Sequence, residues 1–226
     1  TLAEIATESG VAIPQSADPS IVPIEDVTLL EGSPLHIPLD GYDPNGDALT
    51  YTVTVGDTAL VETFVPENNR SISIPVSVGG QDVGDMVFQL FEGRATRATD
   101  RFIELANEDF HQDVIFHRVI DGFMIQGGDP TGTGSGGSDK GDFDDQFHVD
   151  LQHNRTGVLS MAKAGDDTND SQFFVIEEPT RFLDFNHSVF GQLIEGERVR
   201  QTISNVETGG AGEGSTPQDT VVMSAV

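Results

Sequence analysis

The chain has 226 residues, of which 36% are hydrophobic, so it is long enough for one large domain or a medium domain with a small one. It contains no cysteine, which excludes disulfides, thiolate metal sites and a cysteine nucleophile. Its 38 acidic and 11 basic residues give a net charge of −27, which predicts no nucleic-acid partner, and no apolar run is long enough to span a membrane.

The first part of the chain is predicted to hold a linker and a small all-β module. Residues 1–20 carry little periodicity and suggest a linker or a mobile N-terminus. Residues 21–80 contain short β-branched segments separated by turn residues, which is typical of an all-β module. Within them, LHIPLDGYDPNGDALTYTV resembles repeats of bacterial cadherin-like and immunoglobulin-like domains.

The DPNGD turn of this module is a candidate calcium site. Asp43, Asn45 and Asp47 place oxygen-bearing side chains at alternate positions, and such oxygens suit Ca²⁺. An Asp-Pro-Asn-Gly sequence is also accounted for by turn formation alone. Both interpretations are kept at this point.

Residues 81–226 read as a second unit. DMVFQLF predicts a strand, and TDRFIELANEDF predicts a helix with Thr99 as its N-cap. Short strand candidates follow, with a second short helix at GERVRQTI: VIFHRVI, GFMIQGG, GVLSMA, QFFVI, SVFGQLI and TVVMSAV. Many short strands with two helices favour a closed β-barrel with helical plugs.

The glycine-rich stretch GGDPTGTGSGG, residues 127–137, contains the pattern G-x-G-x-x-G of dinucleotide-binding loops. A helix must follow such a loop to receive a pyrophosphate, but SDKGDFDDQF is rich in Asp and Gly. The P-loop pattern also fails, because Ser138 follows Gly137. We therefore expect the glycines to let a surface loop turn tightly and to keep side chains off a neighbouring groove.

Three linked motifs resemble the signatures of the cyclophilins, the peptidyl-prolyl cis-trans isomerases: FHRVIDGFMIQGGDPTGTGSGG, GVLSMAKAGDDTNDSQFFV and FLDFNHSVFGQLIEG. The resemblance implies a mainly β fold, with an eight-stranded antiparallel barrel capped by two helices. It also implies an isomerase that requires no cofactor and that acts on proline-containing peptides or unfolded chains, assisting protein folding.

The chemistry needs a hydrogen-bond donor. The peptide bond before proline loses its conjugation when it twists, and its nitrogen then becomes able to accept a hydrogen bond. A donor aimed there stabilises the transition state selectively. The resemblance places the catalytic arginine at Arg118, with Gln126 and Phe123 as its catalytic partners. It implies these substrate-binding residues: Met124, Ala162, Lys163, Gln172, Phe174, Phe182, Leu183 and His187.

Two positions depart from the family pattern. Phe182 stands where the family often has tryptophan, so we expect weaker binding of the inhibitor cyclosporin with isomerase activity retained. Lys163 stands where asparagine is common, and its cation would favour acidic residues beside the proline. His117, next to the arginine, is expected to be structural.

Two other functions stay open at this stage. In the first, the groove binds proline peptides without catalysing their isomerisation. In the second, the barrel is one structural unit of a larger surface protein. The appended β module favours an extracytoplasmic location, with a periplasmic, cell-surface or secreted protein of bacterial origin as the expectation.

Overall fold

The computed structural model describes residues 18–21, 23–24, 33–37, 39, 41–54, 56, 63, 69–210, 215–224 and 226. The chain divides into two compact units. The smaller comprises Thr1–Thr28 and Ile37–Glu67, and the larger comprises Leu29–His36 and Asn68–Val226.

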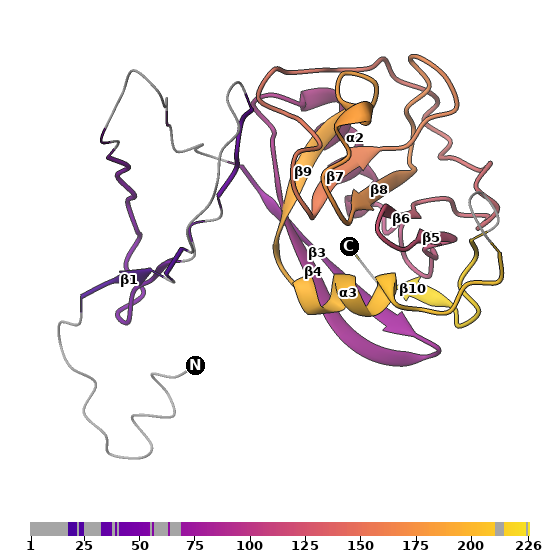
Figure 1. Cartoon of the computed structure of the whole chain (residues 1–226), viewed down its shortest axis with the longest axis horizontal. Coiled ribbons are helices and arrows are strands. Elements are labelled where there is room, and N and C mark those ends of the chain that lie inside the picture. Colours follow the sequence, from indigo (N-terminus) through magenta and orange to yellow (C-terminus); the bar gives the residue numbers. More distant parts are fainter. Residues whose placement is uncertain are drawn as a thin grey trace. The chain divides into compact units, whose positions relative to one another are not determined.

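The larger unit is a curled antiparallel sheet (Figure 1). Within the described residues it has eight strands in the order β10-β3-β4-β9-β7-β8-β6-β5. Their bounds are β3 Ser71–Val78, β4 Gln81–Leu90, β5 Arg118–Ile120, β6 Met124–Gly127, β7 Val158–Met161, β8 Phe173–Ile176, β9 Val189–Glu195 and β10 Val221–Met223. The predicted eight-stranded barrel fold is confirmed.

The two end strands of this order are brought together by the segment before β5. The Phe116 N–H donates to the Val221 carbonyl oxygen at 2.9 Å, and Ile115 forms a bridge with Val222. This contact satisfies edge groups of β10 that would otherwise be unpaired, which is how a closed barrel avoids exposed sheet edges.

The barrel interior is filled by aromatic side chains. Phe88, Phe102, Phe116, Phe173 and Phe190 are among the largest fully buried side chains. Because successive side chains of a strand point to opposite faces, the neighbours of these residues face outward. On β8 this alternation sends Phe173 into the core, where it contacts Phe102 edge-on at 5.3 Å, and leaves Phe174 for the other face.

Among the residues that the structure describes, two α-helices pack on the sheet: α2 (Thr96–Asn107) and α3 (Glu197–Ser204). In Figure 1, α2 lies above β7 and β8 and α3 lies below them. The N-cap predicted at Thr99 is wrong, because α2 has Ala95 as its N-cap. The Thr99 hydroxyl instead donates to the Ala95 carbonyl oxygen at 3.1 Å, which is the back-bonding that a threonine makes inside a helix.

The barrel sheet begins before the boundary that the sequence suggested at residue 80. β3 was expected in the N-terminal module, but it pairs with β4 along its whole length and supplies the eighth strand of the barrel. Alternation alone cannot say which sheet a β-branched segment joins, because the period is the same in either.

In the smaller unit, β1 (Ser20–Ile21) pairs with β2 (Gly41–Tyr42). Within the segment 21–80 that was predicted to be all-β, the described residues 48–54 form no strand. The carboxylate of Asp43 accepts hydrogen bonds from the N–H of Asn45 at 2.7 Å and of Asp47 at 3.3 Å, which is turn chemistry. Calcium binding there stays a prediction. Much of the remaining module lies outside the described residues, and its cadherin-like character stays a prediction too.

Two further findings concern the described part of the chain. None of its helices has the length and apolar character needed to cross a membrane. None of its clusters of three or more His, Cys, Asp or Glu side chains is placed to hold a metal ion.

Candidate active site

A cavity of about 970 Å³ opens on the barrel between β5, β6, β8 and two long loops. It brings together ten of the eleven residues that the cyclophilin resemblance assigned to the site: Arg118, Phe123, Met124, Gln126, Ala162, Lys163, Gln172, Phe174, Leu183 and His187. The eleventh, Phe182, does not line the cavity. Side chains from three separate motifs therefore share one cavity.

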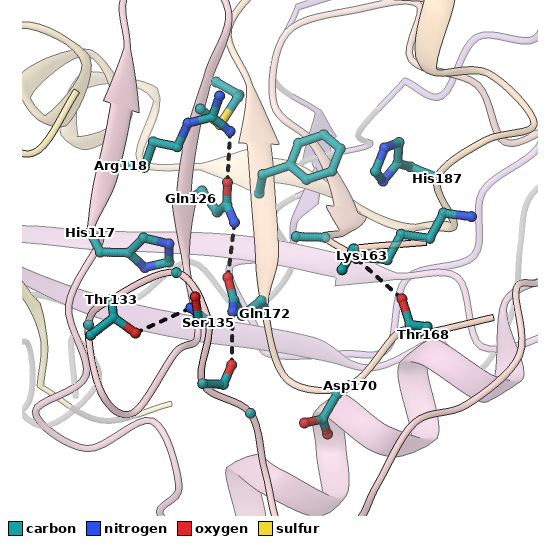
Figure 2. A pocket seen from close by; sticks show the side chains of 18 of the residues that line it. His117, Arg118, Gln126, Thr133, Ser135, Lys163, Thr168, Asp170, Gln172 and His187 are labelled. Carbon is teal, nitrogen blue, oxygen red and sulfur yellow. Dashed lines mark hydrogen bonds between the residues drawn. The ribbon is translucent and has the colours of Figure 1, made fainter. Parts of the chain in front are cut away.

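One side of the cavity is polar and is built as a chain of hydrogen bonds (Figure 2). The Arg118 Nη1 donates to Gln126 Oε1 at 3.1 Å, and Gln126 Nε2 donates to Gln172 Oε1 at 3.0 Å. Gln172 Nε2 then donates to the Gly136 carbonyl oxygen at 2.8 Å. We call Arg118, Gln126, Gln172 and the loop 129–136 the polar wall.

The direction of this chain is determined at its glycine end. The Gly136 carbonyl can only accept, so it holds the amide nitrogen of Gln172 and turns the Gln172 oxygen toward Gln126. Gln126 is thereby oriented with its own oxygen toward Arg118, where a guanidinium can only donate. One backbone carbonyl thus fixes which end of each glutamine amide faces the arginine.

The glycine-rich loop wraps around a carboxylate of the protein. The buried Asp129 accepts backbone hydrogen bonds from Thr131 at 2.7 Å, Thr133 at 3.0 Å, Gly134 at 2.6 Å and Gly136 at 3.1 Å. Burial alone would raise the pKa of Asp129, but these hydrogen bonds outweigh it and hold that pKa well below its usual range. The N–H groups that a phosphate-binding loop would offer to a nucleotide are thus occupied internally.

Glycine is required at the point where this loop meets the polar wall. A Cβ built on Gly136 would lie 2.1 Å from an Asp129 carboxylate oxygen, so any side chain there would displace the carboxylate. Gly132 and Gly134 have positive φ angles of 65° and 82°, which L side chains rarely adopt. Gly132–Gly137 line the cavity, as expected for a loop that leaves a groove open.

The other side of the cavity is apolar, and we call Phe123, Met124, Phe174, Leu183 and His187 the apolar wall. Met124, Phe174 and Leu183 are buried. The Phe174 ring meets the His187 ring edge-on, with 5.4 Å between centroids. Such a surface suits a compact apolar ring such as that of proline.

His187 has no acid–base role in this geometry. Its Nδ1 lies 2.9 Å from the Met161 carbonyl oxygen, which fixes the ring and its tautomer as a hydrogen-bond donor. Burial lowers the pKa of His187, and burial also lowers that of His117, which lines the cavity beside the loop. Both imidazoles are therefore expected to be neutral at pH 7.

Phe182 and Lys163 differ from their expected roles. Phe182 stacks on Phe123 with 5.8 Å between centroids and stays 73% exposed, so it lies on the rim of the apolar wall. The Lys163 ammonium pairs with the nearly buried carboxylate of Asp145 and, at 3.3 Å, with Asp166. Burial would lower the pKa of Lys163, but these carboxylates raise it. A neutralised cation gives no reason to expect a preference for acidic substrates.

A buried network behind the apolar wall was missed by the sequence reasoning. His153 Nδ1 lies 3.2 Å from Asp184 Oδ1, and His153 Nε2 lies 3.0 Å from the Ser160 hydroxyl. This is the order of a serine hydrolase triad, but Ser160 is fully buried and no substrate reaches it. The ring of His153 stacks on Phe174, with 6.0 Å between centroids, so the network supports the wall.

The cavity wall also includes residues that the sequence reasoning did not assign: Ala164, Thr168, Asp170 and Thr216. The first three lie within the second motif, so the motif itself was the available signal. Thr216 belongs to a separate segment, and no local pattern indicated it.

Comparison with known proteins agrees with this geometry. The family model for cyclophilin type peptidyl-prolyl cis-trans isomerase matches residues 74–226. The peptidyl-prolyl cis-trans isomerase ppi1 of Schizosaccharomyces pombe is 46% identical over 128 residues, which is 56% of this chain and 83% of that protein. The peptidyl-prolyl cis-trans isomerase-like 1 of Aspergillus oryzae is 45% identical over 130 residues, 57% of this chain and 81% of that protein.

Solved structures agree as well. The crystal structure of a cyclophilin type peptidyl-prolyl cis-trans isomerase from Cryptosporidium parvum has a TM-score of 0.64 and 34% identity, covering 70% of this chain and 96% of that one. A second crystal structure of that protein, in the presence of the dipeptide Ala-Pro, has a TM-score of 0.63 and covers 69% and 96%. The chain therefore belongs to the cyclophilin-type peptidyl-prolyl cis-trans isomerase family, and its function is the cis–trans isomerisation of peptide bonds that precede proline.

Proposed function

We propose that Arg118 catalyses this reaction by donating a hydrogen bond to the proline nitrogen as the peptide bond twists. The observation that carries the proposal is the directed chain from Gly136 to Arg118, which holds the guanidinium at the cavity. A guanidinium has five N–H donors, so its bond to Gln126 is compatible with donation to substrate. The nitrogen accepts only when it is twisted, so the bond lowers the barrier without stabilising either planar isomer.

The apolar wall is proposed to hold the proline ring while the preceding residue rotates. Phe174, Met124 and Leu183 offer a buried apolar surface, and Phe123 with Phe182 extends it to the rim. Burial of an apolar ring favours both isomers and the transition state alike, so this wall supplies affinity. Gln126 and Gln172 are proposed to orient Arg118 and to contact the substrate backbone.

The proposed substrates are extended or unfolded chains, and the proposed role is assistance of protein folding. The cavity runs from the apolar wall past Gly132–Gly137 to Ala164 and Thr168, and at about 970 Å³ it is far larger than a single proline ring. Room for the residues on either side of proline requires a substrate segment without its own tertiary structure. Uncatalysed isomerisation takes tens to hundreds of seconds and can limit folding, which gives such an enzyme its use.

The test is exchange between cis and trans forms of a short Ala-Pro-Phe-type peptide, followed by NMR with the full chain. We expect acceleration by the wild type and by Arg198→Ala, a matched change of an exposed arginine on α3, and loss of it in Arg118→Ala. Binding of the peptide without acceleration by the wild type would favour the alternative function, a non-catalytic proline-binding module. Full acceleration by Arg118→Ala would reject the role of this arginine.

Several expectations from the sequence remain proposals beside this one. We propose that catalysis needs no cofactor, that cyclosporin binds weakly, and that the chain, with its net charge of −27, binds no nucleic acid. The cadherin-like character of the upstream segment, calcium at Asp43, Asn45 and Asp47, and an extracytoplasmic location are proposed from the sequence patterns alone. Calorimetric titration of the full chain with Ca²⁺, compared with Asp43→Asn, tests the metal site.

A further inference from the structure

A short segment far upstream of the barrel in sequence belongs to the barrel's own unit. Ser33–His36, which we call the strap, is grouped with Asn68–Val226, whereas Ile37 begins the next part of the smaller unit. All four strap residues are partly buried. The strap lies outside the family match, which covers residues 74–226, so the family relationship does not account for it.

The strap offers acceptors, and the barrel offers donors. The Ser33 hydroxyl accepts hydrogen bonds from Asn154 Nδ2 at 3.2 Å and from Arg181 Nη1 at 3.1 Å. Asn154 also donates to the Pro34 carbonyl, and Arg155 donates to the His36 carbonyl. Proline has no backbone N–H, so Pro34 can contribute only a hydrogen-bond acceptor. The matching of donors to acceptors indicates a specific contact.

An aromatic contact anchors the end of the strap. The His36 ring lies against the buried Phe91 with 4.4 Å between centroids. Burial lowers the pKa of His36 to about 4, helped by the nearby cations of Arg94 and Arg155 and opposed by Asp150. Burial likewise lowers the pKa of Arg155, and a desolvated guanidinium is costly unless it is hydrogen-bonded.

The strap reaches the apolar wall through one guanidinium. Arg181 begins the 3₁₀ helix η1 (Arg181–Leu183), which carries Phe182 and Leu183. Its Nη2 donates to Gln152 Oε1 at 2.5 Å, its Nε donates to Asp184, and its Nη1 donates to Ser33. Asp184 also accepts from the His153 N–H at 2.7 Å. Arg181 thus joins the strap, the 152–155 loop and the turn beneath the wall.

We infer that the strap positions the apolar wall: by holding Gln152–Arg155 against Arg181–Asp184, it keeps Leu183 and Phe182 in place for the proline ring, with Arg155 and Arg181 as positioning residues. The inference rests on the proposed function, because it takes Leu183 as part of the proline site. It adds that residues upstream of the family match are part of the isomerase unit and affect substrate affinity.

The strap should therefore influence KM and leave kcat nearly unchanged. Phe174, Met124, Arg118 and Gln126 lie on strands, whereas η1 lies in a loop that is held by side-chain hydrogen bonds. Loosening η1 costs affinity for proline in the ground and transition states alike. It does not move Arg118, which is held by Gln126 and by the pairing of β5 with β6.

The experiment uses the full chain with His36→Ala, with Arg155→Ala, and with Arg198→Ala as the matched control on α3. We expect His36→Ala and Arg155→Ala each to raise KM about three- to ten-fold and to keep kcat within about two-fold of the wild type. The control should change neither constant. Hydrogen exchange should quicken at the amides of His153, Leu183, Asp184 and His187, each of which has a partner in this region. Arg155→Lys keeps a hydrogen-bond donor, so its KM should lie between those of Arg155→Ala and the wild type.

Docking of the strap is monitored independently by NMR titration of His36. In the wild type the ring is expected to titrate near its buried pKa of about 4. Burial lowers this pKa more than the Arg155 cation does, so release of the strap in Arg155→Ala should move it most of the way to 6.5, further than loss of the cation alone. A wild-type His36 that titrates near 6.5 would overturn the inference. The inference would also be overturned if the strap were released in Arg155→Ala while KM and amide exchange stayed as in the wild type. If Arg155→Ala does not fold, His36→Ala decides, because its side chain lies outside the barrel sheet.

Failure of the strap and failure of the proposed function are separable. Arg118→Ala tests the catalytic donor by its kcat, while the His36 titration and the amide exchange of residues 153 and 183–187 do not depend on catalysis. An active Arg118→Ala would reject the proposed role of Arg118. The His36 titration and the amide exchange would then still test whether the strap positions the apolar wall.

Discussion

The polar and apolar walls of the cavity are held in place by different interactions. The polar wall is a directed chain of hydrogen bonds that ends on a loop wound around Asp129. The apolar wall rests on packing and on the η1 turn, which is held by Arg181, by Asp184 and, as we infer, by the strap. On the polar side, a backbone carbonyl therefore fixes the orientation of the glutamine amides and of Arg118. On the apolar side, the affinity for proline depends on a loop that is held by side chains.

The largest expected effect is on the polar wall. Arg118→Ala should lower kcat/KM by about 10²–10³-fold, the cost of removing one preorganised donor at a developing acceptor. Arg118→Lys should recover little, because an ammonium lacks the planar fork that Gln126 orients. The measurement is the NMR exchange rate of a proline peptide at saturating and at low peptide concentration. A loss below about three-fold would contradict the transition-state role.

Acidification should act on the buried histidines before it acts on Asp129 of the polar wall. Burial lowers the pKa values of His153, behind Phe174, and of His111, in the core, to about 4 from the ordinary value of 6.5. Both histidines are neutral in the folded protein, so the unfolded chain binds more protons below pH 6.5, and stability falls as pH drops from 6.5 toward 4. Each contributes on the order of 3 kcal/mol when the window is crossed.

The contribution of Asp129 to stability depends on a lower pH range. Its lowered pKa means that its contribution is present above the unfolded value of 3.8 and is lost only at more acidic pH. The loss of stability between pH 6.5 and pH 4 is therefore expected to come from the two buried histidines and not from Asp129. Urea unfolding at pH 7, 6 and 5 checks this, with His111→Phe as a variant that keeps the stacking on Phe102 and removes one titrating group. A midpoint that does not change between pH 7 and pH 5 would contradict the assignment.

A smaller effect is expected when the loop is loosened from its centre. Asp129→Asn keeps the size of the side chain but places an amide N–H₂ among backbone N–H groups that need an acceptor. We expect a loss of about 2 kcal/mol in unfolding free energy and about a ten-fold fall in kcat/KM, because Gly136 no longer orients Gln172. Asp139→Asn, an exposed position after the same loop, is the control. Unchanged kcat/KM with lowered stability would mean that the loop does not orient the chain.

The smallest effect on isomerisation is expected at the rim. Phe182→Trp adds an indole N–H donor and apolar area at a position that is 73% exposed. Cyclosporin affinity should rise by about ten-fold, the value of roughly one hydrogen bond, while peptide isomerisation stays within about two-fold. Calorimetric titration with cyclosporin measures this. Equal affinity in the two proteins would show that the rim residue does not limit inhibitor binding.

The fold could be predicted largely because alternation and motif order are local signals. Alternation on β8 places Phe173 in the core and Phe174 at the cavity, as the structure has them. The errors came where a segment's partner decides its role. β3 looks like any exposed strand until β4 pairs with it, and Thr99 resembles a cap until Ala95 starts the helix one turn earlier.

The cavity residues followed from the motifs, but their connections did not. Nothing in the sequence near Lys163 shows that Asp145 neutralises it, since the two meet only when two loops fold together. His153 with Asp184 and Ser33 with Arg181 are joined across long stretches of chain in the same way. Contacts of this kind depend on tertiary structure, which spacing along the chain does not encode.

The most direct test measures binding and exchange in one NMR titration of a proline peptide with Arg118→Ala and with Phe174→Ala. We predict that Arg118→Ala binds the peptide with a Kd within about three-fold of the wild type while its exchange rate collapses, and that Phe174→Ala loses affinity first. Equal losses of affinity and of exchange rate in Arg118→Ala would contradict the claim that Arg118 acts on the twisted bond alone.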